Sequence, residues 1–135
     1  MPAPAIRQRG RALVLDDEEC IRRMSSAMLQ RLGLEPVAVA DGHDALRAYT
    51  QARQEGRPFA LVILDLTIPG GLGGEETMRE LLKTDPEVRA IVSSGYSNNP
   101  VLSDHRRYGF KGKVSKPYQF ADLGLVVDQL LPKSN

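Results

Sequence analysis

The chain has 135 residues, a length typical of one domain, and such a chain can fold without a metal ion or a disulfide. Its 18 Lys and Arg residues nearly balance 17 Asp and Glu residues, which argues against a domain that binds nucleic acid or a membrane surface. The single cysteine, Cys20, excludes an internal disulfide, and no apolar stretch approaches the roughly 20 residues of a membrane span or resembles a signal peptide, so we expect a cytoplasmic protein.

Short apolar runs alternate with segments whose apolar residues recur at helical spacing. The first segment, Met1–Arg11, is rich in proline and arginine, and we expect a flexible lead-in or linker. The expected strands are residues 12–15, 36–40, 59–64, 90–93 and 110–115, the last interrupted by Gly112. The expected helices are residues 18–32 (ending at Gly33), the segment after the capping residue Asp41, residues 75–82, a short polar helix between 100 and 108, and residues 119–131.

Five strand–helix units in strict alternation predict an α/β fold. Such a pattern is typical of a single doubly wound domain of three layers, with a parallel sheet between two layers of helices. We expect this domain to span residues 12–131 and to be followed by a tail at residues 132–135.

Carboxylates follow two of the predicted strands. Asp16 and Asp17 come after the first strand, and Asp65 comes after the third, before a loop rich in glycine and proline. The carboxyl ends of parallel strands share one edge of a sheet, so the three carboxylates converge if these strands are neighbours. Their repulsion is relieved by a divalent cation, and oxygen ligands beside an incoming phosphate suit Mg²⁺ best. Taken singly, Asp16 and Asp17 could merely cap a helix, and Asp65 could merely form a turn.

Two further strand ends carry groups that suit a phosphate. Ser94 is followed by Gly95, where the backbone can approach a ligand closely, and Lys116 is followed by Pro117. A hydroxyl, an ammonium and free backbone N–H groups are what phosphoryl oxygens require. Alone, Ser94 could be a turn residue and Lys116 a solvated lysine, but together they predict a phosphoryl site.

In these strand-end residues the chain resembles the receiver domain of two-component response regulators. The residues that carry the resemblance are Asp16-Asp17, Asp65, Ser94-Gly95 and Lys116-Pro117. The resemblance extends from about residue 11 to residue 131. It implies a flavodoxin-like sheet of order 2-1-3-4-5. The loops at residues 65–74 and 93–100 resemble most closely the receivers of hybrid sensor histidine kinases, in which Met1–Arg11 would join an upstream kinase. A standalone single-domain response regulator is the alternative.

The resemblance also implies a role for each site residue. Asp65 would accept a phosphoryl group from the phosphohistidine of a histidine kinase, in cis or in trans, and a histidine phosphotransfer domain is a further expected partner. The receiver itself would be a phosphoacceptor with at most slow autodephosphorylation, whereas a parent histidine kinase would be a phosphotransferase. Mg²⁺, or alternatively Mn²⁺, would be bound by Asp16, Asp17, Asp65 and the main-chain carbonyl of Thr67. The phosphoryl oxygens would be held by Ser94, Gly95 and Lys116, and the Lys116–Pro117 bond would be cis.

One position departs from the family pattern. Many relatives carry an aromatic residue on the fifth strand that swings inward on phosphorylation, and this chain has Lys113 there. A charged ammonium does not suit an apolar pocket, so we expect a muted or altered output change. The resemblance also implies a dimer surface formed by the fourth helix, fifth strand and fifth helix. Tyr96, two residues past Ser94, could cover the site and slow hydrolysis, or could equally be an exposed loop tyrosine.

Three rival functions fit less well. A nucleotide-binding enzyme is suggested by the glycines at residues 70–74, but Glu76 occupies the place of the third glycine of the dinucleotide fingerprint. A Mg²⁺-dependent aspartate-nucleophile phosphatase would carry a second aspartate where this chain has Thr67. A degenerate receiver that serves only as an interaction module would not need the intact acidic residues, Ser94 and Lys116.

Overall fold

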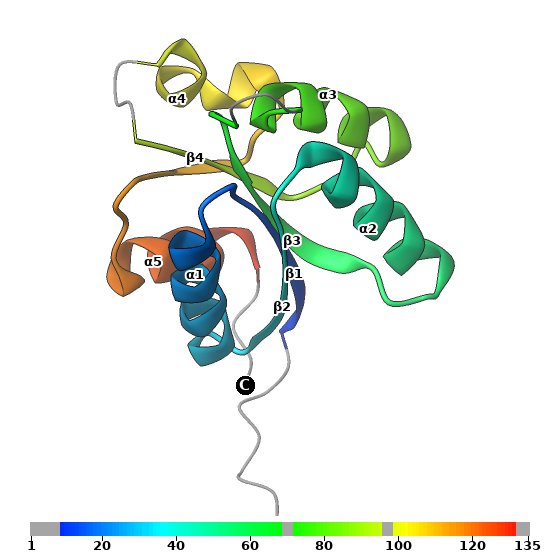
Figure 1. The fold of residues 1–135 in the computed structure, drawn as a ribbon, viewed down its shortest axis with the longest axis horizontal. Coiled ribbons are helices and arrows are strands. Elements are labelled where there is room, and N and C mark those ends of the chain that lie inside the picture. Colours follow the sequence, from blue (N-terminus) through cyan, green and yellow to red (C-terminus); the bar gives the residue numbers. More distant parts are fainter. Residues whose placement is uncertain (1–8, 69–71, 96–98, 132–135) are drawn as a thin grey trace, which may run out of the picture.

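The five apolar runs form one parallel sheet of order β2-β1-β3-β4-β5 in the computed structural model (Figure 1), which confirms the predicted fold class. The structure describes residues 9–68, 72–95 and 99–131, so most of the predicted lead-in, the predicted tail, Tyr96 and part of the glycine-rich loop lie outside the described residues. The strands are β1 (Gly10–Leu15), β2 (Leu34–Val39), β3 (Phe59–Asp65), β4 (Ala90–Ser94) and β5 (Gly112–Ser115).

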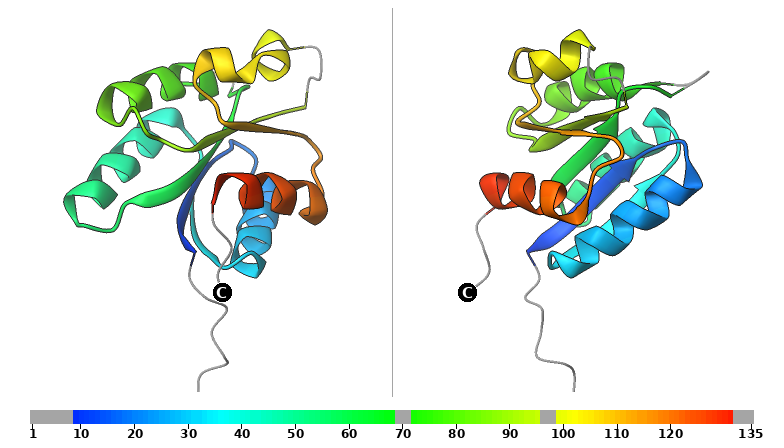
Figure 2. Two further views of the ribbon diagram at one scale, coloured as in Figure 1. Left: turned by 180° about the vertical axis from the view of Figure 1, so that it is seen from behind. Right: turned by 90° about the vertical axis from the view of Figure 1, so that its left-hand side faces the viewer.

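Helices cover both faces of the sheet (Figure 2). They are α1 (Glu19–Arg31), α2 (Gly42–Gln54), α3 (Gly74–Thr84), α4 (Pro100–Ser103), the 3₁₀-helix η1 (His105–Tyr108) and α5 (Phe120–Leu130). One face packs against α1 and α5, and the other packs against α2, α3 and α4. None of the helices in the described part of the chain is long and apolar enough to cross a membrane.

The three central strands β1, β3 and β4 are largely apolar on both sides because both of their faces are buried. Leu13 and Val62 belong to the core under α2 and α3, whereas Ala12 and Ile63 belong to the core under α1 and α5. Successive side chains of a strand point to opposite faces, so a strand between two helical layers needs an unbroken apolar run. This requirement explains why the runs were visible in the sequence.

The beginning of the domain differs from the prediction. Residues 9–11 are part of the fold: β1 begins at Gly10, and the Arg11 guanidinium lies 4.6 Å from the centre of the Phe59 ring. The predicted lead-in, Met1–Arg11, therefore wrongly included residues 9–11, which belong to the domain. Arg9 and Arg11 contact the domain, which composition alone could not indicate.

The fourth and fifth strand–helix units also differ in detail. The predicted polar helix is α4 followed by η1, and its Val101 and Leu102 are buried. The fifth strand begins at Gly112, two residues later than predicted, although Phe110 is buried before it. A Cβ on Gly112 would lie 2.6 Å from a methyl group of Val126, so this glycine lets α5 pack closely on the sheet instead of merely interrupting a strand.

β2 forms one open edge of the sheet and contains Pro36. The carbonyl of Val39 accepts a hydrogen bond from the N–H of Asp16, so alternate residues of β2, counted back from Val39, direct their backbone groups toward β1. By the same alternation, Pro36 directs its nitrogen, which carries no hydrogen, toward the open edge.

Candidate functional site

A pocket of about 560 Å³ lies at the carboxyl ends of the strands. Loops that follow β1, β3, β4 and β5 all contribute to it, as expected for a ligand site in a parallel α/β sheet. It is lined by Asp17, Glu18, Ile21, Asp65, Thr67, Gly95, Lys116 and Pro117. Residues that are 100 positions apart in the chain therefore meet around one cavity.

Lys116 joins two of the predicted carboxylates. Its Nζ lies 2.9 Å from Oδ2 of Asp16 and 3.3 Å from Oδ2 of Asp65, and all three side chains are largely buried. Burial alone would lower the pKa of the Lys116 ammonium, but the hydrogen bond to Asp16 and the charge of Asp65 raise it overall. Lys116 therefore stays charged between two carboxylates.

Asp65 has one oxygen that is buried without a hydrogen bond. Its Oδ1 accepts a 3.4 Å bond from the N–H of Thr67, whereas its Oδ2 has only the ion-pair contact with Lys116 and no hydrogen bond of good geometry. Burial first, and then the negative charge of Asp16, raise the pKa of Asp65 to about 6, although Lys116 and the Thr67 N–H oppose the rise. Asp65 lines the pocket, so its carboxyl group borders the space that a ligand would occupy.

The tightest acidic cluster differs from the predicted one. Among the described residues, ligand atoms of Asp16, Asp17 and Glu18 lie within 4.8 Å of one another, and Asp65 is outside this set. Lys116 lies between Asp16 and Asp65 and offsets their repulsion. The sequence analysis missed Glu18, although three consecutive acidic residues after a strand were a visible signal.

The site nevertheless fits a hard cation. Its charged donors are carboxylate oxygens, which Mg²⁺ prefers, and Oδ2 of Asp65 is buried without a hydrogen-bond partner. Asp17 and Asp65 line the same pocket as Thr67, whose carbonyl was the fourth predicted ligand.

Two of the three predicted phosphate-binding residues, Gly95 and Lys116, line this pocket. Among the described residues, a Cβ built on Gly95 would meet no atom within 4 Å, so this position leaves room for a ligand. Ser94 is buried at the end of β4 and is not among the lining residues. The Lys116–Pro117 bond is cis, as the resemblance implied.

Lys113 lies on β5 and is exposed, and it is not among the residues that line the pocket. It is close enough to His105 on η1 to affect its titration: partial burial, and then the positive charges of Lys113 and Arg106, lower the pKa of His105. The atypical position is therefore part of a positively charged surface.

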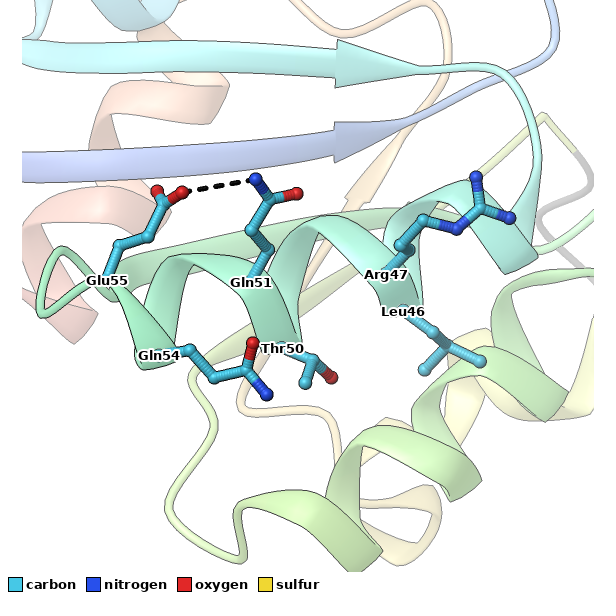
Figure 3. Close-up of a pocket in the computed structure, with 6 residues that line it drawn as sticks. All are labelled: Leu46, Arg47, Thr50, Gln51, Gln54 and Glu55. Carbon is cyan, nitrogen blue, oxygen red and sulfur yellow. Dashed lines mark hydrogen bonds between the residues drawn. The ribbon is translucent and has the colours of Figure 1, made fainter.

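A second, larger hollow of about 690 Å³ runs along α2 (Figure 3). It is lined by Leu46, Arg47, Thr50, Gln51, Gln54 and Glu55. All of these side chains belong to α2 or to its C-cap residue Glu55, and Gln51 donates a 3.1 Å hydrogen bond to Glu55. The smaller pocket is the better candidate for function, because four loops place buried charged groups around it.

Comparisons with known proteins place the chain in a family. Residues 12–128 match the family described as "Response regulator receiver domain". The chain is 27% identical over 124 residues to "Sporulation initiation phosphotransferase F" of Bacillus subtilis, an alignment that covers 91% of this chain and 95% of that protein. It is 28% identical over 126 residues to "Sensor kinase CckA" of Brucella abortus, covering 91% of this chain but only 13% of that protein.

Among solved structures, the receiver domain of NtrX from Brucella abortus superposes with a TM-score of 0.80 at 31% identity. That alignment covers 91% of this chain and 99% of the other.

Proposed function

Since the chain belongs to the response regulator receiver domain family, we propose that it accepts a phosphoryl group onto Asp65 from the phosphohistidine of a histidine kinase, in a Mg²⁺-dependent reaction. The observation that carries this proposal is the Oδ2 atom of Asp65, which is buried, lacks a hydrogen bond and belongs to a residue lining the pocket. A buried acceptor without a hydrogen bond is costly to a fold even beside the Lys116 ammonium, so this oxygen suits a group that acquires a ligand during function.

The proposed reaction is an in-line displacement at phosphorus. A carboxylate oxygen of Asp65 attacks the phosphorus, the P–N bond to the imidazole breaks, and the imidazole leaves with that electron pair and takes up a proton. The product is an acyl phosphate on Asp65. Lys116 is held against the attacking carboxylate and balances negative charge on the transferred group, and the open loop at Gly95 leaves room for its oxygens.

Asp17 and Asp65, with the carbonyl of Thr67, are the proposed ligands of Mg²⁺, and Asp16 and Glu18 are close enough to contribute directly or through water. Bound Mg²⁺ supplies positive charge that offsets the oxygens of the phosphoryl group. Mn²⁺ has similar ligand preferences and is expected to substitute.

The test is phosphorylation by a small-molecule donor. The protein is incubated with Mg²⁺ and acetyl phosphate or phosphoramidate, and the intact mass is measured. We expect an increase by one phosphoryl group that maps to Asp65, that EDTA prevents, and that is absent from folded Asp65→Asn.

Two outcomes would contradict the proposal. A folded wild-type protein that gains no phosphoryl group would instead be a degenerate receiver that acts as an interaction module. Rapid multiple turnover of phosphomonoesters would instead favour an aspartate-nucleophile phosphatase.

We further propose that the domain is part of a hybrid sensor histidine kinase that acts in the cytoplasm. The similarity to a segment of "Sensor kinase CckA" supports this context, whereas the near full-length match to "Sporulation initiation phosphotransferase F" supports a standalone regulator. Sequencing the whole gene product distinguishes them, because a hybrid kinase encodes an ATP-binding kinase domain upstream.

We propose a muted or altered output change on the surface of α4, β5 and α5. Lys113 is exposed there beside other positive groups, and Leu125 on α5 is 63% exposed, which also suits self-association through this face. A structure of the phosphorylated protein that shows the full rearrangement of the family at this surface would contradict the muted switch.

A further inference from the structure

The loop between β1 and α1 holds three negative charges in a small space. Ligand atoms of Asp16, Asp17 and Glu18 all lie within 4.8 Å of one another. Like charges at this range repel, so without other contacts the loop would open and carry its oxygens away from Asp65. Something must hold the backbone of this loop in place.

Four hydrogen bonds fix Asp16 in that loop, and one of them is the 2.9 Å bond that Nζ of Lys116 donates to its Oδ2. The N–H of Asp16 donates to the carbonyl of Val39 on β2 at 3.1 Å, and its Oδ1 accepts from the N–H of Glu18 at 3.0 Å. Its main-chain carbonyl accepts a 2.9 Å bond from Nη1 of Arg22, which lies on α1. The guanidinium is the one partner of Asp16 that reaches back from within α1, and hydrogen bonds from a charged donor are among the strong ones.

We infer that Arg22 is a positioning residue for the cation site: its guanidinium fixes the Asp16 carbonyl and thereby sets the orientation of the Asp16 and Asp17 carboxylates toward Asp65. This inference rests on the proposed Mg²⁺-dependent function. Arg22 acts through Asp16. It is not among the residues that line the pocket with Asp65; it lines a separate hollow together with Arg23 and Ala38.

The charge of Arg22 and its positioning role have opposite consequences. A positive charge near an acidic site repels a cation, so the loss of that charge alone should tighten Mg²⁺ binding. The loss of the hydrogen bond should loosen the loop and weaken Mg²⁺ binding. The sign of the change therefore separates the two effects.

Arg23 provides a matched control. It is the next residue of α1, carries the same charge and is exposed. Arg22→Ala and Arg23→Ala each remove one positive charge from the same helical turn, but only Arg22→Ala removes the bond to Asp16.

The experiment measures the dissociation constant for Mg²⁺ by isothermal titration calorimetry, at a temperature where circular dichroism shows every variant folded. We expect Arg22→Ala to bind Mg²⁺ about tenfold more weakly than wild type, the lower end of the range for groups that orient metal ligands. Arg23→Ala should bind equally well or slightly more tightly. Phosphorylation of Arg22→Ala by acetyl phosphate should recover as Mg²⁺ is raised to saturation.

Arg22→Lys keeps the positive charge but has a shorter side chain without the planar guanidinium. It replaces Arg22→Ala in the Mg²⁺ titration if Arg22→Ala does not fold. We expect intermediate weakening. Mg²⁺ affinity in the Arg22 variants equal to that of Arg23→Ala would overturn the inference and leave the proposed function intact. Wild-type protein that binds no Mg²⁺ would overturn the proposed function itself.

Discussion

Asp65 and Asp16 are both buried carboxylates, and a single ammonium, that of Lys116, lies between them. One positive charge does not fully offset two negative charges, and this imbalance is why the pKa of Asp65 rises to about 6, after the larger effect of burial. In an unfolded chain an aspartate titrates near 3.9. Folding therefore favours the protonated form of Asp65 in the absence of a cation.

A pH dependence of stability follows. A carboxyl whose pKa is higher in the folded state stabilises the fold at low pH, and this contribution is lost as the pH rises through the folded value. In EDTA, we expect the free energy of unfolding to increase by on the order of 2 kcal/mol between pH 7.5 and pH 4.5 because of Asp65. Urea denaturation at several pH values measures this change in the free energy of unfolding.

Asp65→Asn is the control, because the amide has nearly the same shape and does not titrate. The pH-dependent difference between wild type and Asp65→Asn should shrink in excess Mg²⁺, since a bound cation favours the ionised carboxylate. A difference that stays constant over this pH range would show that Asp65 is not the titrating group.

At the scale of single residues, the sequence was informative about strand ends and much less so about contacts. Asp65 and Lys116 could be placed because parallel strands bring their carboxyl ends together. Glu18 was signalled by its place directly after the pair Asp16-Asp17, although the sequence did not show that the loop brings its carboxylate beside theirs. Arg22 could not be placed, because its role depends on the rotamer of one long side chain, which no periodic pattern encodes.

The packing of α2 against α3 depends on a glycine at the start of α2. A Cβ on Gly42 would lie 2.5 Å from the carbonyl oxygen of Leu72 and 2.8 Å from its Cβ. The added Cβ would also meet the hydroxyl oxygen of Thr77 on α3. Leu72 lies in the loop before α3 and its backbone cannot move away as a flexible side chain could, so α2 would have to move away from α3 and this loop.

We therefore expect Gly42→Ala to destabilise the protein by about 1–3 kcal/mol, a typical cost of overpacking. Gly124→Ala is the matched control within α5, where the added Cβ would make an ordinary 3.4 Å contact with Leu32. An alanine inside a helix is favoured over glycine by about 1 kcal/mol, so Gly124→Ala should be neutral or stabilising. Thermal denaturation compares the two, and equal melting temperatures would contradict the packing argument.

Elements with strong periodicity were predicted closely, and weak ones were not. α1 and α2 begin where acidic residues precede apolar spacing, and Asp41 caps α2 by accepting a 2.6 Å bond from the N–H of His43, as predicted. The fifth strand was drawn too long because Phe110 is apolar and buried without being in the sheet. Burial and strand pairing are separate properties that composition does not distinguish.

Across the whole molecule, Arg9 links two helices that are far apart in the chain. Its guanidinium donates to the carbonyls of Leu32 and Leu131, the C-cap residues of α1 and α5, each at 3.3 Å, and forms a 2.8 Å ion pair with Asp128. Its side chain is only 8% exposed. These contacts satisfy helix carbonyls that lack partners within their own helices.

Arg9→Ala should lower the free energy of unfolding by about 2 kcal/mol, in the range for hydrogen bonds to a charged group. Urea denaturation measures the change, and Arg23→Ala, which removes an exposed arginine, should have little effect. A similar loss in both variants would show that total charge matters and the link between α1 and α5 does not.

The alternation of strands and helices predicted a doubly wound fold, but it did not by itself order the strands. The order β2-β1-β3-β4-β5 was an inference from the family, and the structure confirms it. The order depends on which crossovers pack best, a property of the complete core that no single segment specifies.

The proline on the outer strand has a consequence for solubility at high concentration. An unprotected strand at the rim of a sheet is a template on which another chain can add its own strand, and such growth leads to aggregates. At Pro36 an incoming chain would find no amide hydrogen to bind, so the ladder would be interrupted in the middle of β2. Pro36 thereby discourages the addition of another strand along β2, while the carboxyl ends of the strands stay free for chemistry.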